Sequence, residues 1–178
     1  MVIQYAILGL LSRQPLAGYD LKKLFAEAET LYWSGNSNQI YRMLVKLHKD
    51  NFVTQEVHQQ EDAPARKVYT ITQAGKEALL TWLQTPPELP QVRNHFMLQL
   101  TWASQLNDAD LEKLLTLYEE ELRVKQMMIR EQLQRDKGLA ENLGNSRSRL
   151  LESRITERWL DYYAHELAWV QDLRQEIL

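Results

Sequence analysis

Side chains that can bind nucleic acid gather on one face of a helix that the sequence predicts between Asn38 and Lys49. Ile40, Leu44 and Leu47 recur at i, i+4 and i+7 and therefore form one apolar stripe. The opposite face carries amide and cationic groups and no acid. Such groups hydrogen-bond to base edges and pair with phosphates in a major groove. The candidate contacts on this helix are Asn38, Gln39, Tyr41, Arg42, Lys46 and Lys49.

Two β-rich runs follow this helix, Val53–His58 and Arg66–Ile71, separated by the polar stretch 59–65. They have the composition of paired strands, so we expect a β-hairpin. A helix followed by such a hairpin is the order of elements in a winged helix-turn-helix. In that fold the helix, here Asn38–Lys49, is the reader helix that contacts bases, and the hairpin, here 53–71, is the wing. Arg66-Lys67 add two phosphate candidates at the second strand, whereas Glu61-Asp62 argue against deep insertion of the tip into a groove.

Each of these groups also has a plainer interpretation. Arg42, Lys46 and Lys49 alone are more typical of the solvated face of an amphipathic helix than of a DNA contact. The hydroxyl of Tyr41 either reaches a phosphate or stays half-buried beside the apolar stripe. The combination of a capping pair, Asn36-Ser37, with the polar face and the hairpin favours the DNA-binding interpretation.

The other elements of the first half should form the core that supports this helix. We expect helices over 2–12 and 19–29, with a turn bracketed by Pro15 and Gly18. Thr72 should cap a fourth helix, whose apolar stripe consists of Ala74, Ala78, Leu79 and Trp82. Three prolines between residues 86 and 90 then interrupt the helical pattern. We therefore expect a winged helix-turn-helix domain over 1–85, a proline-rich linker over 86–93 and a second domain over 94–178.

The second domain should consist mainly of long helices. The pattern predicts helices over 94–105, 109–137 and 147–177, with a reversal at Gly138 and Gly144-Asn145-Ser146. Two helices of roughly 30 residues have longer apolar stripes than one hairpin can cover, and an identical chain is the simplest partner. We therefore expect a mainly α (α+β) protein whose antiparallel, coiled-coil-like second domain makes a homodimer. The candidate dimer residues are Leu111, Leu115, Tyr118, Leu122, Ile155, Trp159, Tyr162 and Leu173.

Aromatic residues in the second half are the one indication of a small-molecule site. A pocket for a small aromatic effector would be lined by Trp102, Trp159, Tyr163 and Trp169. The plainer interpretation is that these rings form a dimer or interdomain core.

Composition excludes several other functions. The chain has 178 residues, no cysteine and a formal net charge of −3, with nine Lys/Arg against eight Asp/Glu in residues 1–85. The sequence contains neither a phosphate loop nor a catalytic or zinc motif, and its four histidines are scattered. Glu119-Glu120-Glu121 is most simply a solvated helix face. We expect no enzyme activity, no cofactor, no metal and no membrane span, and a cytoplasmic location.

Several motifs resemble the PadR family of winged-helix transcriptional regulators. They are Ala6-Ile7-Leu8-Gly9-Leu10-Leu11, Gly18-Tyr19-Asp20-Leu21, Gln39-Ile40-Tyr41-Arg42-x-Leu44, and Arg66-Lys67-Val68-Tyr69-Thr70-Ile71-Thr72-x-x-Gly75. Many members have proline after the tyrosine of the reader helix. Arg42 stands there in this chain, and together with the long second half it favours the AphA-like branch.

The resemblance implies a homodimeric, sequence-specific regulator that binds double-stranded DNA at a pseudo-palindromic promoter site. Members of the family mostly repress, some activate, and some respond to phenolic or other aromatic compounds. No ligand motif of the second half aligns residue by residue. The alternative hypothesis is a protein-interaction module whose winged helix binds no specific DNA, because a fold alone does not settle function.

Overall fold

The computed structural model describes residues 2–27, 37–59, 66–89, 94–139 and 146–177. The chain forms two compact units, Met1–Leu89 and Pro90–Leu178. The predicted wing tip with Glu61-Asp62, residues 90–93 of the predicted linker and the predicted reversal at Gly144 lie outside the described residues. None of the described helices is long and apolar enough to cross a bilayer.

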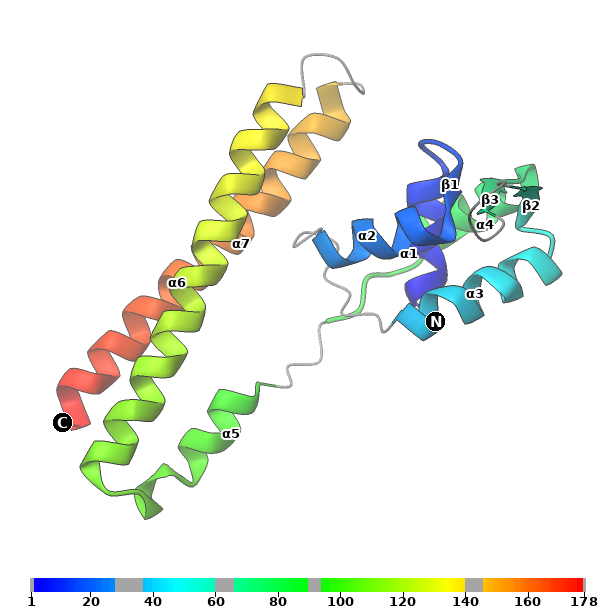
Figure 1. Cartoon of the computed structure of the whole chain (residues 1–178). Coiled ribbons are helices and arrows are strands. Elements are labelled where there is room, and N and C mark those ends of the chain that lie inside the picture. The colour runs from blue at the N-terminus through cyan, green and yellow to red at the C-terminus, as the bar shows by residue number, and fades with distance from the viewer. Residues whose placement is uncertain (1, 28–36, 60–65, 90–93, 140–145, 178) are drawn as a thin grey trace. The chain divides into compact units, whose positions relative to one another are not determined.

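The described part of the first unit is helical with a small sheet (Figure 1). Its elements are α1 (Val2–Leu11), β1 (Leu16–Ala17), α2 (Gly18–Glu27), α3 (Ser37–Lys49), β2 (Val53–His58), β3 (Arg66–Ile71) and α4 (Gln73–Leu83). The sheet is antiparallel in the order β1-β3-β2, and β2 pairs with β3 from Val53↔Ile71 to His58↔Arg66. The predicted strands have the bounds that the structure shows, and the predicted reader helix differs from α3 by one residue.

The apolar stripe of α3 lies in the core of this unit. Ile40, Leu44 and Leu47 are each at most 1% exposed, as predicted, and Met43 is buried beside them. They pack with buried residues of the other helices and of the sheet, which include Ile3, Ile7, Leu8, Leu11, Leu21, Phe25, Val53, Tyr69 and Ile71. Burial of this stripe leaves the opposite face of α3 in solvent.

Two local predictions in this unit are wrong. The segment between Pro15 and Gly18 is more than a turn, because Leu16 and Ala17 form β1 and pair with Tyr69 and Val68 of β3. The predicted stripe of α4 included Ala74, but that side chain is exposed and Gly75 is buried in its place. The reason is a close approach of α4 to the backbone of Phe52, described below.

The second unit is helical throughout its described elements. They are α5 (His95–Thr101), the short 3-10 helix η2 (Ala103–Gln105), α6 (Asp108–Leu139) and α7 (Ser146–Ile177). Asn94 caps α5 through Oδ1, which accepts a hydrogen bond from Met97 N, and Asn107 accepts one from Asp110 N. The helices α6 and α7 lie side by side in antiparallel directions (Figure 1). Gly138 does not end the helix as predicted, since α6 continues to Leu139.

The core of the second unit joins α5, α6 and α7. Its buried members are Phe96, Leu115, Leu122 and Val170. Leu115 and Leu122 are 0% and 3% exposed, because α5 and α7 of the same chain already cover them. Their side chains therefore offer no surface to a second copy, contrary to the predicted dimer contact.

Candidate nucleic-acid interface

The predicted DNA-binding side chains of α3 lie on its solvent face. Asn38, Gln39, Tyr41, Arg42, Lys46 and Lys49 are all exposed. Val45 lies among them and is 66% exposed. α3 contains no acidic residue, so this face combines two amides, three cations and one small apolar side chain. It can therefore hydrogen-bond, neutralise phosphate and contact a methyl group, as major-groove binding requires.

A tight corner positions the wing relative to α3. Asn51 has a positive φ of 59°, and the backbone N of Phe52 donates to Leu47 O at 2.9 Å. The left-handed conformation at Asn51 ends the helix and directs the chain straight into β2. The Nδ1 atom of His48 also lies 3.2 Å from Val53 O, which links the last turn of α3 to the first residue of β2.

Thr72 and Gly75 attach the start of α4 to the same corner. The hydroxyl of Thr72 donates to Asn51 O at 2.8 Å and accepts from Gly75 N at 3.1 Å, as predicted for a helix cap. The backbone N of Thr72 donates to Phe52 O at 3.0 Å. A Cβ at Gly75 would lie only 2.2 Å from Phe52 O. Glycine is therefore needed where α4 meets the corner that joins reader and wing.

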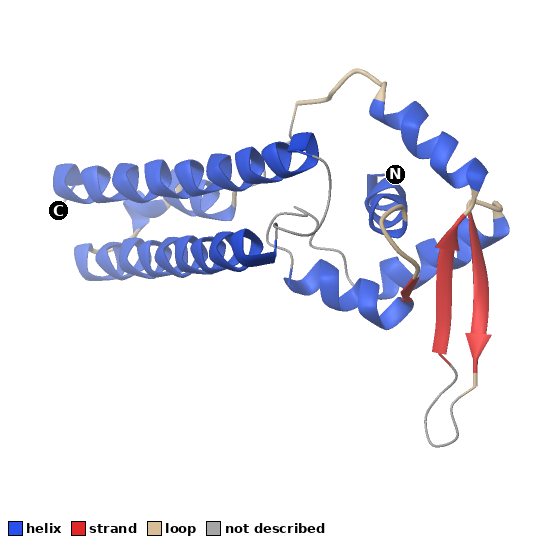
Figure 2. Ribbon diagram, turned by 90° about the horizontal axis from the view of Figure 1, so that it is seen from above, coloured by secondary structure: helices blue, strands red, loops and turns tan. Residues whose placement is uncertain are grey.

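The hairpin carries the other two predicted contacts. Figure 2 shows β2 and β3 as a long antiparallel pair that projects from the helices of the first unit. Arg66 and Lys67 open β3 and are both exposed. Arg66 is also held within the chain, because its Nη2 donates to Asp20 Oδ2 at 2.8 Å. Asp20, in the first turn of α2, also accepts a hydrogen bond from Ala17 N at 3.3 Å.

Tyr41 of α3 faces the start of α2. A Cβ at Gly18 would lie 2.8 Å from the Tyr41 ring, so glycine lets this ring lie against the start of α2. The side chain is nevertheless 44% exposed. Burial raises the pKa of Tyr69, and the charge interaction with Tyr41 raises it further. The ring of Tyr41 thus packs against α2 on one side and is accessible to solvent on the other, so its geometry is compatible with the predicted phosphate contact.

The predicted effector residues are distributed over the second unit. Trp159 makes ring contacts with Tyr162 and Tyr163, at centroid distances of 5.5 and 6.1 Å. Trp169 makes an edge contact with Phe96 at 6.5 Å. The fourth residue, Trp102, lines a surface pocket of about 400 Å³ formed by α5, η2 and α6. The rings thus contribute to two packed clusters and one surface pocket.

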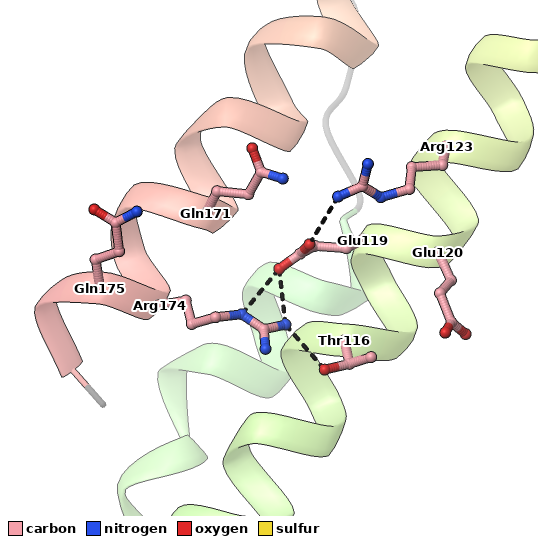
Figure 3. Close-up of a pocket in the computed structure, with 7 residues that line it drawn as sticks. All are labelled: Thr116, Glu119, Glu120, Arg123, Gln171, Arg174 and Gln175. Atoms are coloured by element: carbon pink, nitrogen blue, oxygen red, sulfur yellow. Dashed lines mark hydrogen bonds and ion pairs between the residues drawn. The ribbon is translucent and has the colours of Figure 1, made fainter.

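A larger pocket of about 630 Å³ lies between α6 and α7, lined by charged and polar side chains (Figure 3). Glu119 Oε1 accepts from Nε and Nη2 of Arg174 at 3.0 and 2.7 Å, and Arg174 Nη2 also donates to Thr116. Arg123 contacts the other oxygen of Glu119 at 3.4 Å. Glu119 is only 9% exposed, so its predicted place on a solvated face is wrong. Glu119 and Arg123 of α6 and Arg174 of α7 thus form an ion-pair network, here called the clamp, in which Arg174 links α7 to α6.

Sequence reasoning missed three residues that shape these sites. Asp20 contacts Arg66 and Arg174 contacts Glu119 across 46 and 55 residues, for which the sequence carries no signal. Asn51 had a signal, because asparagine directly after a helix often adopts the left-handed conformation.

Comparison with known proteins supports this architecture. Residues 7–81, which hold α3 and the wing, match the model of the transcriptional regulator PadR-like family. That match covers most of the first unit of this chain. It is 38% identical over 107 residues to the negative transcriptional regulator PadR of Bacillus subtilis, an alignment that covers 60% of this chain and 59% of the relative. The fold is that of the family's winged-helix structures, mostly helical with a small sheet.

Solved structures resemble the chain over its whole length. The crystal structure of Bacillus subtilis PadR in complex with operator DNA is similar with a TM-score of 0.82, at 28% identity and over 100% of both chains. The same protein in complex with p-coumaric acid is similar with a TM-score of 0.77, at 28% identity over 99% of this chain and 95% of that one. The Vibrio cholerae virulence activator AphA is similar with a TM-score of 0.70, at 27% identity over 98% of this chain and 96% of that one. The last similarity supports the AphA-like branch.

Proposed function

We propose that this PadR-type regulator binds promoter DNA in a sequence-specific manner, as a homodimer, and acts in the cytoplasm. The observation that carries the proposal is the acid-free face of α3, with Asn38, Arg42 and Lys49 in solvent beside an anchored wing. The full-length similarity to a PadR in complex with operator DNA supports it. In this proposal α3 lies in the major groove and Lys67 approaches the adjacent phosphates.

A homodimer needs a surface that the protomer leaves uncovered. Leu117, Val124 and Met128 are 52%, 46% and 41% exposed and share one face of α6. That face is opposite the one that buries Leu115 and Leu122, because the two sets are offset by about half a turn. Of the predicted contacts on α7, Ile155 is 45% exposed. We propose that these exposed faces pair between two copies.

The dimer is tested by size-exclusion chromatography with light scattering. Val124→Glu places a charge in the proposed contact and should give monomers at concentrations where the unaltered protein is dimeric. Gln134→Glu adds the same charge at an exposed position roughly a quarter-turn from this face and should leave the dimer intact. Dimers in both variants would place the interface elsewhere.

DNA binding is tested by fluorescence anisotropy on the protein's own upstream promoter and on a scrambled duplex. The promoter should bind roughly a thousandfold more tightly. Arg42→Ala should cost about 1–3 kcal/mol and relax preference at one base position. Lys67→Ala should weaken both duplexes and flatten the salt dependence. Lys113→Ala is the control: it removes an exposed cation from the second unit and should change neither the affinity for the two duplexes nor the salt dependence.

Equal, steeply salt-dependent binding to both duplexes would contradict specific recognition. A protein partner recovered under those conditions would favour the interaction-module alternative.

We further propose repression as the sign of regulation and a small aromatic effector as its modulator. The supports are the negative regulator to which the chain is 38% identical and the p-coumaric acid complex. Titration with phenolic acids should quench tryptophan fluorescence to saturation and weaken promoter binding. A Trp169→Ala variant should lose most of the quenching, since this ring is 40% exposed beside Phe96. A panel of aromatic acids without saturable quenching would contradict an effector of this class.

A further inference from the structure

One carboxylate connects the first helix of the helix-turn-helix to the wing. Oδ2 of Asp20 accepts a hydrogen bond from Arg66 Nη2 at 2.8 Å and another from the backbone N of Ala17 at 3.3 Å. The side chains of Arg66 and Asp20 are 52% and 37% exposed. Arg66 is thus paired within the chain and still accessible to a ligand.

Asp20 places a negative charge next to the proposed DNA-binding surface, where it would repel phosphates unless it also assists binding. α3 presents no acid to its solvent face, and a negative charge beside a phosphate backbone weakens binding. Asp20 nevertheless contacts Arg66, one of the proposed phosphate contacts, directly.

We propose that Asp20 is a positioning residue of the DNA interface, which rests on the DNA-binding function proposed above. A guanidinium carries five N–H donors in a planar fork. The contact with Asp20 uses Nη2, so other donors of the fork remain for a phosphate oxygen. Because Asp20 has already ordered the long side chain of Arg66, binding loses less conformational entropy.

The second hydrogen bond of Asp20 adds a geometric role. Ala17 belongs to β1, which pairs with Val68 of β3. Asp20 therefore holds the β1–α2 junction and the first residue of β3 together. Arg66 reaches the DNA backbone from a defined place relative to α2, and the wing and the helix-turn-helix approach DNA as one surface.

The experiment compares Asp20→Asn with a matched control in the full-length protein. Asp20→Asn keeps the shape and an oxygen acceptor for Ala17 N but removes the charge that holds Arg66. Binding to the upstream promoter duplex should weaken about two- to fivefold, the range expected for one exposed ion pair. Asp50→Asn removes an equal charge from an exposed position directly after α3. That control should bind both duplexes as tightly as the unaltered protein, or more tightly.

Salt dependence distinguishes positioning from a general loss of structure. If Arg66 leaves its phosphate in Asp20→Asn, the slope of log affinity against log salt should fall by about one. Asp20→Glu retains the carboxylate and should restore the slope. The double variant with Arg66→Ala should bind no more weakly than Arg66→Ala alone, because both changes remove the same contact.

Two results would overturn the proposal. Tighter binding of Asp20→Asn to promoter and scrambled duplex alike would make Asp20 a repulsive neighbour only. Additive losses in the double variant, or unchanged binding, would mean that Asp20 does not act through Arg66. Failure of the DNA-binding function itself gives a different result, namely that the unaltered protein does not distinguish the two duplexes.

Discussion

Gly75→Ala tests whether the start of α4 lies directly on the corner between reader and wing. The added Cβ would lie 2.2 Å from Phe52 O, 2.9 Å from Ile71 Cγ1 and 3.1 Å from Phe52 C. The first distance is roughly 1 Å shorter than the about 3.3 Å at which carbon and carbonyl oxygen ordinarily meet. Two of the three obstructing atoms belong to the backbone. A side-chain rotation therefore cannot relieve the overlap, and α4 must move.

The cost of that movement follows from the contacts it disturbs. Overpacking of this kind costs about 1–3 kcal/mol, and weakening the hydrogen bond from Thr72 N to Phe52 O adds about 1 kcal/mol. Alanine offsets about 0.5–1 kcal/mol, because it is the better helix former. We therefore expect a net loss of about 1–3 kcal/mol. In a unit of this size the melting temperature should fall by about 5–20 °C.

Gly9→Ala is the matched control on another helix of the same unit. A Cβ at Gly9 in α1 would meet nothing within 4 Å. The same substitution there should raise stability by about 0.5–1 kcal/mol, since only the helix-propensity gain applies.

Scanning calorimetry of both full-length variants gives the two shifts. Hydrogen exchange of peptides from α1, α3 and α4 assigns them to the first unit. A Gly75→Ala variant as stable as the unaltered protein would refute the close approach of α4. If both substitutions shifted the melting temperature in the same direction, the space around the added Cβ would not be what decides the effect of each substitution.

Three further predictions concern stability. Arg174→Ala should lower the free energy of unfolding of the second unit by about 1–3 kcal/mol in urea titrations, because Glu119 then stays nearly buried with one weaker partner; an unchanged midpoint would contradict the clamp. Asn51→Gly should be neutral or stabilising and Asn51→Val should cost about 1–2 kcal/mol in thermal melts, since a β-branched residue is strained at a positive φ; equal melting temperatures would contradict the left-handed corner. Burial and then the hydrogen bond to Glu166 raise the pKa of Tyr118 above 10. The stability linked to Tyr118 should therefore be complete below about pH 10 and be lost as pH rises through the folded-state value. Unfolding midpoints between pH 8 and pH 11.5 should fall less steeply in Tyr118→Phe; parallel profiles would contradict it.

Sequence alone determined the elements that depend on local patterns. Composition predicted β2 and β3 at their observed bounds, and the spacing of Ile40, Leu44 and Leu47 predicted which face of α3 is buried. The cap at Thr72 was likewise predictable, because its hydrogen bond reaches only three residues along the chain. These features depend on interactions within one turn or one strand, so neighbouring residues specify them.

Only the tertiary structure decided which distant residues meet. The pairs Asp20–Arg66 and Glu119–Arg174 form because separate elements pack together, and no local periodicity of the sequence specifies which elements pack. The role of Leu115 changed for the same reason. Its stripe on α6 was visible in the sequence, but an apolar stripe does not state whether its own chain or another covers it. Burial against α5 and α7 settled that choice within the protomer, because apolar surface is stabilised by whichever neighbour removes it from water.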